Sequence, residues 1–234
     1  MFTLFWLVLV TGSLIYNRKH LPQDYKDSKF LRKNLRPRHF AVGLLSVLSV
    51  MLVATILYAY IPPLRFGWLT WLATQGAETQ TGQTVESSSA MWIAIIAMIL
   101  AFSVFLPKLA YIEEEIFRKP YVWKPAKTQA LQSLKFGLIH LTMGIPIAAA
   151  LALSISGAIF ATVATKTARK TKTPLLQAVS QLPQEYKTEN NIDRETITKA
   201  AEENGILESA LVHTAHNYLI VTLLLASAII TLSV

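Results

Sequence analysis

Long apolar blocks separated by short charged segments are the main pattern of this sequence. The block from Phe40 to Ile61 runs for 22 residues without a charged side chain, and Pro62-Pro63 ends it. At a rise of about 1.5 Å per residue, a helix of this length crosses the hydrocarbon core of a bilayer. The pattern therefore predicts an all-α, polytopic transmembrane helical bundle rather than a soluble domain.

About six spans are predicted in this way. The block from Phe136 to Thr165 holds 30 residues without a charge, and Gly144 and Pro146 divide it into two short, tightly connected helices. The predicted spans are residues 1–16, 40–61, 91–111, the two halves of 136–165, and 206–234.

A polar segment of mixed charge, residues 166–205, separates the last two predicted spans. Within it, residues 193–204 are predicted to form a short helix with Asp193 as N-cap and Gly205 just past its end. The chain thus divides into residues 1–90, with two N-terminal helices, and a core of residues 91–234 that carries this segment as an insertion.

The distribution of charge predicts the orientation in the membrane. Eight Lys and Arg residues lie between Arg18 and Arg38, against Asp24 and Asp27 alone. The positive-inside rule places this loop in the cytoplasm and the N-terminus outside. Residues 75–89 contain no Lys or Arg and suit the outer face.

Composition narrows the classes of function. Only 15% of residues are charged and mean hydropathy is +0.41, whereas soluble domains carry about 25% charged residues. The net charge of +8 comes from residues that flank apolar spans, so we expect anionic lipids rather than nucleic acid as partners. The chain has no cysteine, which excludes thiolate chemistry and cysteine-ligated metals.

Three ionisable residues are expected to meet near the cytoplasmic face. Glu113, His140 and His213 each follow the last charged residue of their predicted helix by five positions, which places both histidines about 7–8 Å inside the helix ends. Ionisable groups at membrane depth are functional candidates because burying them is costly. The alternative for each residue alone is a solvated helix end or an interhelical hydrogen bond.

The residue types in this layer favour hydrolytic chemistry. A carboxylate and an imidazole can hold and deprotonate a water, and a second imidazole with Asn217, four residues after His213, can stabilise an oxyanion. Glu113, His140 and His213 could instead hold a zinc ion. No H-E-x-x-H motif decides between the two. Arg118 is expected to balance charge.

Three motifs in this order resemble the CPBP family, which contains the type II CAAX prenyl endopeptidases and related bacterial intramembrane proteases and bacteriocin-immunity proteins. They are Glu113-Glu114-x-x-x-Arg118, Phe136-x-x-x-His140 and His213-x-x-x-Asn217. The resemblance covers residues 91–234 apart from the insertion and implies a glutamate-dependent peptide hydrolase.

The resemblance also implies roles for these residues. Glu113, assisted by Glu114, and His140 would position the attacking water. His213 and Asn217 would stabilise the oxyanion, and Arg118 and Phe136 would support the site. The substrate would be a membrane-embedded or lipidated peptide cleaved from the cytoplasmic side.

Two departures from the family pattern keep a second hypothesis open. Lys119 and Pro120 follow Arg118, where the family usually has glycine, and residues 166–205 are an insertion. The alternative is a catalytically silent scaffold or assembly factor bound to another membrane protein complex. A transporter is less favoured because the polar groups gather near one face rather than the midplane.

Several aromatic and histidine residues are predicted to have no chemical role. Trp68, Trp71 and Trp123 are expected to anchor the chain at the membrane interface. His20 and His39 lie in the basic loop and are expected to do nothing chemical.

Overall fold

The chain folds as helices throughout the part that the structure describes. The computed structural model describes residues 21–67, 96–97, 99–100, 103–190 and 192–233. Its elements are α2 (Leu21–Lys33), α3 (Pro37–Tyr60), η1 (Pro62–Arg65), α6 (Leu106–Phe117), η2 (Lys119–Tyr121), α7 (Ala126–Ile139), η3 (His140–Met143), α8 (Ile147–Ser180), α9 (Gln184–Glu189) and α10 (Arg194–Ser233). The all-α prediction is confirmed for these residues.

Three of these helices are long and apolar enough to cross a membrane. They are α3, α8, and α10 from Arg194 to Ser227. The predicted span of residues 40–61 corresponds to α3. The predicted span of residues 1–16, Trp68 and Trp71 lie outside the described residues. So do 91–95, 98 and 101–102 of the predicted span 91–111.

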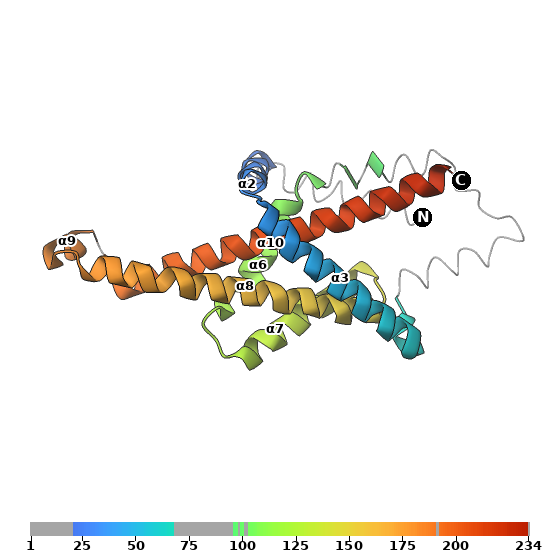
Figure 1. The fold of residues 1–234 in the computed structure, drawn as a ribbon, viewed down its shortest axis with the longest axis horizontal. Coiled ribbons are helices and arrows are strands. Elements are labelled where there is room, and N and C mark those ends of the chain that lie inside the picture. The colour runs from blue at the N-terminus through green and yellow to red at the C-terminus, as the bar shows by residue number, and fades with distance from the viewer. Residues whose placement is uncertain (1–20, 68–95, 98, 101–102, 191, 234) are drawn as a thin grey trace, which may run out of the picture.

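The two longest helices, α8 and α10, form an antiparallel pair around which the others pack (Figure 1). Helix α3 crosses both, α7 packs along α8, and α6 packs against α10. Small residues allow the close approach: a Cβ on Gly137 would lie 2.3 Å from the Ala150 carbonyl oxygen of α8. Interfaces of small residues are typical of helix packing in membranes.

The chain turns sharply between α7 and α8, as the sequence predicts. Gly144 adopts a φ of 81°, and the backbone N–H of Ile147 donates to the carbonyl of Phe66 at 3.0 Å. The predicted division at Gly144 and Pro146 is therefore confirmed. Helix α7 has only 14 residues and is not among the three candidate spans.

The predicted short helix of residues 193–204 is wrong, because α10 continues from Arg194 to Ser233 through Gly205. Gly205 is a packing residue rather than a helix terminator. A Cβ there would lie 2.4 Å from the Ala164 carbonyl oxygen of α8, so its absence allows the helices to touch. The predicted cap is confirmed: Asp193 Oδ1 accepts the backbone N–H of Thr196 at 2.7 Å.

Residues 166–205 are formed by the ends of α8 and α10 with α9 between them, and this hairpin projects from the bundle (Figure 1). Trp123 contacts both arms of this hairpin. The Trp123 indole N–H donates to Glu202 at 3.1 Å, and Lys172 Nζ lies 4.8 Å from the ring centroid.

Candidate active site

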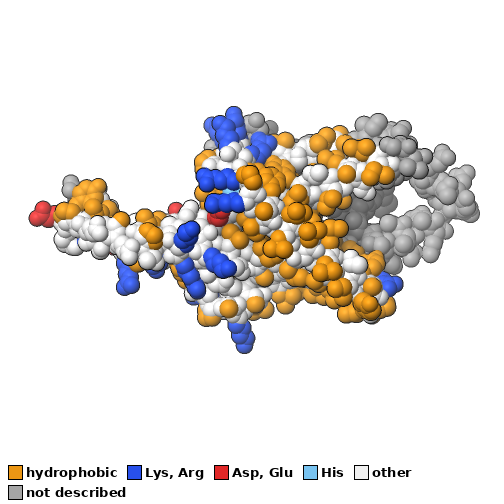
Figure 2. All heavy atoms as spheres, in the orientation of Figure 1, with side chains coloured by type: hydrophobic (Ala, Val, Ile, Leu, Met, Phe, Trp, Pro, Cys, Tyr) orange, Lys and Arg blue, Asp and Glu red, His pale blue; other side chains and the backbone are white. Residues whose placement is uncertain are grey.

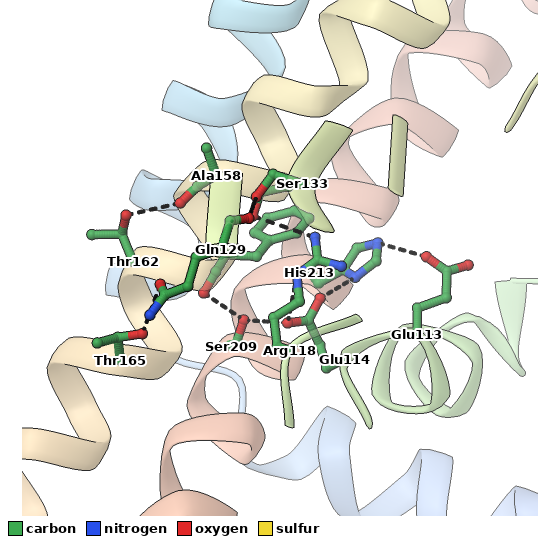
Figure 3. Close-up of polar contacts among 12 residues, drawn as sticks. Glu113, Glu114, Arg118, Gln129, Ser133, Ala158, Thr162, Thr165, Ser209 and His213 are labelled. Atoms are coloured by element: carbon green, nitrogen blue, oxygen red, sulfur yellow. Dashed lines mark hydrogen bonds and ion pairs between the residues drawn. The ribbon is translucent and has the colours of Figure 1, made fainter. Parts of the chain in front are cut away.

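A buried polar cluster forms where α6 packs against α10. Two glutamates of α6, Glu113 and Glu114, and Arg118 at the C-terminal end of this helix contribute to it. Figure 3 shows their side chains directed toward Ser209 and His213 of α10. Phe136 of α7 and Phe160 of α8 enclose the cluster, and both are fully buried. Four segments that are distant in sequence therefore meet at this point.

Glu114 is the centre of the cluster, with 0% of its side chain exposed. Its Oε2 accepts the Ser209 hydroxyl at 2.6 Å and lies 3.5 Å from Arg118 Nε, while its Oε1 accepts His213 Nδ1–H at 3.0 Å. Burial raises the pKa of Glu114, but the Arg118 charge and the two hydrogen bonds outweigh burial and leave the pKa below its ordinary value. Glu114 is thus an ionised, fully partnered carboxylate.

Arg118 is held by aromatic rings as well as by Glu114. Its side chain is 2% exposed, and its guanidinium carbon lies 4.1 Å from the Phe136 ring centroid and 5.7 Å from that of Phe160. Cations are attracted to aromatic faces, more strongly when both are desolvated. The residue therefore neutralises Glu114 inside the protein, as the sequence predicts.

His213 lies between two carboxylates. Its Nδ1 bonds Glu114, and its Nε2 is 3.6 Å from Glu113 Oε2. The ring stacks on Phe160, with centroids 4.4 Å apart and an interplanar angle of 23°. These contacts leave the imidazole a single orientation, with Nε2 directed at Glu113.

The two glutamates differ in exposure, which divides their roles. The Glu113 side chain is 36% exposed as a whole, but its Oε2 is buried against His213 and makes no hydrogen bond within the described residues. Glu113 is therefore the carboxylate whose side chain reaches the protein surface, whereas Glu114 can only orient its neighbours.

His140 does not join the cluster directly. Its Nδ1–H donates to the Phe136 carbonyl at 2.7 Å, and its ring meets the Phe136 ring at a centroid distance of 5.0 Å. No polar contact between described residues links it to Glu113 or His213. Of the three ionisable groups expected to meet, Glu113 and His213 therefore do so in the structure. Because Nδ1 carries the proton of the neutral His140 ring, the other ring nitrogen, Nε2, is a hydrogen-bond acceptor.

Asn217 lies one helical turn beyond His213 on α10 and is half-buried. Its amide makes no hydrogen bond to another described residue, which leaves two donors for a ligand. This placement agrees with the predicted register of the two residues on one helix face.

Ser209 is a member of the cluster that sequence reasoning missed. Its hydroxyl is fully buried and also lies 3.0 Å from the Phe160 carbonyl oxygen. Its position four residues before His213, on the same face of a helix, was the available signal. Serine is too common in membrane helices for that spacing alone to single it out.

A zinc ion in a catalytic site needs three protein ligands. Glu113 Oε2 and His213 Nε2 supply two donor atoms at 3.6 Å. Among the described residues, no three His, Asp or Glu side chains form a group that could hold an ion, and the His140 ring is not placed as a third ligand. The described side chains thus supply two of the three ligands that a catalytic zinc ion needs.

Comparison with known proteins identifies no relative: no family model, no curated protein and no solved structure matches the chain.

Proposed function

We propose that this protein is an intramembrane peptide hydrolase of the CPBP type. The observation that carries the proposal is the Glu113–His213–Glu114 arrangement, in which a buried glutamate orients an imidazole toward a second, partly exposed glutamate. A buried ion-paired carboxylate is costly to maintain, and such groups in membrane proteins are functional candidates by default. The three-motif resemblance supports the same reading.

In the proposed mechanism, a water binds on the exposed side of the Glu113 carboxylate, next to the His213 imidazole. Glu113 accepts a proton from this water while the water oxygen attacks the peptide carbonyl carbon. The C–N bond then breaks, and Glu113 returns the proton to the leaving amine. Asn217 donates hydrogen bonds to the oxyanion. His140, whose ring lies outside the cluster, is given no part in this step.

We further propose that the chain has about six spans and that the basic ends of its helices face the cytoplasm. Figure 2 supports this orientation, since Lys and Arg side chains gather in a band between the apolar surface and the projecting hairpin. The expected substrate is a membrane-embedded or lipidated peptide that is cleaved near the cytoplasmic surface.

The test is cleavage by the full chain in proteoliposomes, with new peptide termini from co-reconstituted native membrane proteins identified by mass spectrometry. Glu113→Gln and His213→Asn should abolish the termini that the unmodified protein produces. Glu115→Gln is the matched control, because Glu115 is adjacent but pairs with Lys119 at 2.9 Å outside the cluster. Identical termini from the protein and from Glu113→Gln would refute the proposal.

A chelator added to the same assay separates two forms of the mechanism. Glutamate-activated water predicts that 1,10-phenanthroline leaves the yield of termini unchanged. Loss of cleavage that added zinc restores would instead indicate a metal held by Glu113 and His213 with a further ligand.

A scaffold or assembly factor is the second candidate, and the projecting hairpin favours it. The hairpin is built from two span-forming helices that extend beyond the apolar surface, which offers a polar surface to a partner (Figure 1). Purification from native membranes in mild detergent tests this. A stoichiometric membrane complex that Glu113→Gln retains would favour the scaffold, and purification without a stable partner would refute it.

A further inference from the structure

Helix α2 has a face that no other described part of the chain covers. Lys26, Lys29, Phe30 and Lys33 recur at spacings of three and four residues, so they share one side of the helix. All four are exposed, with Phe30 at 55%. None of the three lysines makes an ion pair with another described residue.

The opposite side of α2 is held by the bundle. Asp27 forms an ion pair with Lys108 Nζ of α6 at 2.6 Å, and Arg32 hydrogen-bonds the Tyr218 side chain of α10. Ser28 and Leu31 are buried between these contacts. Since the inner side is fixed in this way, the rotation of α2 is set and its basic side must point outward.

Helix α2 also lies at a defined depth. Only residues 34–36 separate it from α3, the first described candidate span, and three extended residues reach about 10 Å at most. Helix α2 packs against α6, and Figure 1 shows it end-on where α3 begins. Figure 2 shows Lys and Arg side chains over the same place, level with the edge of the apolar surface. The exposed side is therefore at the height of lipid headgroups.

We propose that α2 is a docking helix for anionic phospholipids of the membrane in which the chain is embedded. Lys26, Lys29 and Lys33 contact the headgroups, and Phe30 inserts between them. A purely solvated helix face would explain the lysines but not an aromatic ring among them, whereas interfacial helices combine both residue types. The proposal does not depend on peptide hydrolysis.

The test uses the full chain in lipid nanodiscs. The sequence contains no cysteine, so Phe30→Cys creates a single site for an NBD fluorophore. Quenching by doxyl-labelled lipids should be stronger in equal mixtures of phosphatidylcholine and phosphatidylglycerol than in phosphatidylcholine alone. Neutralising Lys26, Lys29 and Lys33 to Gln should remove the difference, since each lysine near an anionic surface is worth roughly fivefold in binding.

Two controls separate docking from general effects of charge or folding. The probe on Tyr186→Cys, exposed on α9 at the tip of the hairpin, should remain unquenched in both lipids. Neutralising Lys187, Arg194 and Lys199 to Gln removes the same number of charges elsewhere and should leave quenching at position 30 intact. In the Phe30→Cys protein with Lys26, Lys29 and Lys33 unchanged, high salt should also abolish the difference in quenching between the two lipid compositions. This tests the proposal without a lysine variant.

Equal quenching at position 30 in both lipids would overturn the proposal. Quenching that survives neutralisation of the three lysines would overturn it as well. A probe that stays in water in every disc would instead assign this face of α2 to a soluble partner.

Discussion

Two clusters, each of a glutamate, a histidine and an arginine, join α10 to a neighbouring helix. They differ most in the burial of their side chains. The outer cluster joins α3 to α10. Arg38 pairs with Glu208 at 2.9 Å, and His39 Nε2–H donates to Glu208 at 3.0 Å. The Arg38 side chain is 61% exposed and Glu208 is 22% exposed, so water screens their pairing.

The inner cluster uses the same three side-chain types, Glu114, Arg118 and His213, with exposures of 0%, 2% and 4%. A pair of charges removed from water gains little net stability over apolar packing, but breaking it leaves an uncompensated buried charge. The comparison indicates that the outer cluster fastens two helices. The inner one places charged groups where they gain little over apolar packing, and the proposed hydrolytic site would account for their presence.

The largest expected effect is from Arg118→Met, which should lower the free energy of unfolding by about 3–5 kcal/mol because Glu114 loses its counter-charge. Thermal or denaturant unfolding in a fixed detergent measures this. Adding Glu114→Gln should recover part of the loss, since no buried charge then remains. A loss no greater than that of Arg38→Met would contradict the role given to burial.

Ser209→Ala should cost about 1.5–3 kcal/mol, the range for a hydrogen bond to a charged group. It should also raise the pKa of Glu114. The folded-state pKa of Glu114 is below its ordinary value, so its charge stabilises the fold above that ordinary value and the contribution is lost as pH falls through the folded-state pKa. Melting temperature measured against pH should therefore begin to fall at a higher pH in the variant.

Ser156→Ala is the control for that pH effect. Its hydroxyl accepts the hydroxyl of Ser46 at 2.8 Å in a buried contact without a charge. The variant should lose stability with no change in the pH profile. A pH shift of equal size in both variants would remove Ser209 from the Glu114 network.

Glu208→Ala should lower stability by about 1–2 kcal/mol, through His39 rather than Arg38. His39 is 1% exposed, and its Nδ1 accepts the backbone N–H of Arg36, so the Nε2–H would be left buried without its acceptor. Unfolding of Glu203→Ala, an exposed glutamate on the same helix, provides the reference. Equal stability of the two variants would show that the outer cluster contributes nothing.

Arg38→Met should have the smallest effect, at most about 1 kcal/mol, because its guanidinium is largely in water. Unfolding at low and high salt should show that even this difference fades as salt screens the pair. A larger, salt-independent loss would mean that the outer cluster behaves like a buried one.

The fold follows from the sequence wherever apolar length decides it. The block from Phe40 to Ile61 predicts α3, and Gly144 with Pro146 predicts the turn before α8. Gly205 misled the prediction because a glycine that ends a helix and one that lets two helices touch look alike in a single sequence. The sequence places His39 in the basic loop, whereas the structure buries it in α3, where it bonds to Glu208.

The site was predictable in its residue types but less so in its contacts. Glu113 and Glu114 are neighbours in sequence and point about 100° apart on a helix, so only one can face the interior. Which one does so depends on the rotation of α6 against α10, and no local pattern sets it. The displacement of His140 toward the Phe136 carbonyl depends in the same way on the end of α7.

The continuity of α10 through Gly205 has a mechanical consequence. The helix touches α8 at this point, about 16 Å from Arg194 at its outer end and about 12 Å from His213. One unbroken helix therefore carries both the outer end of the projecting hairpin and the imidazole of the buried cluster, so the two parts of the molecule share a rigid connection.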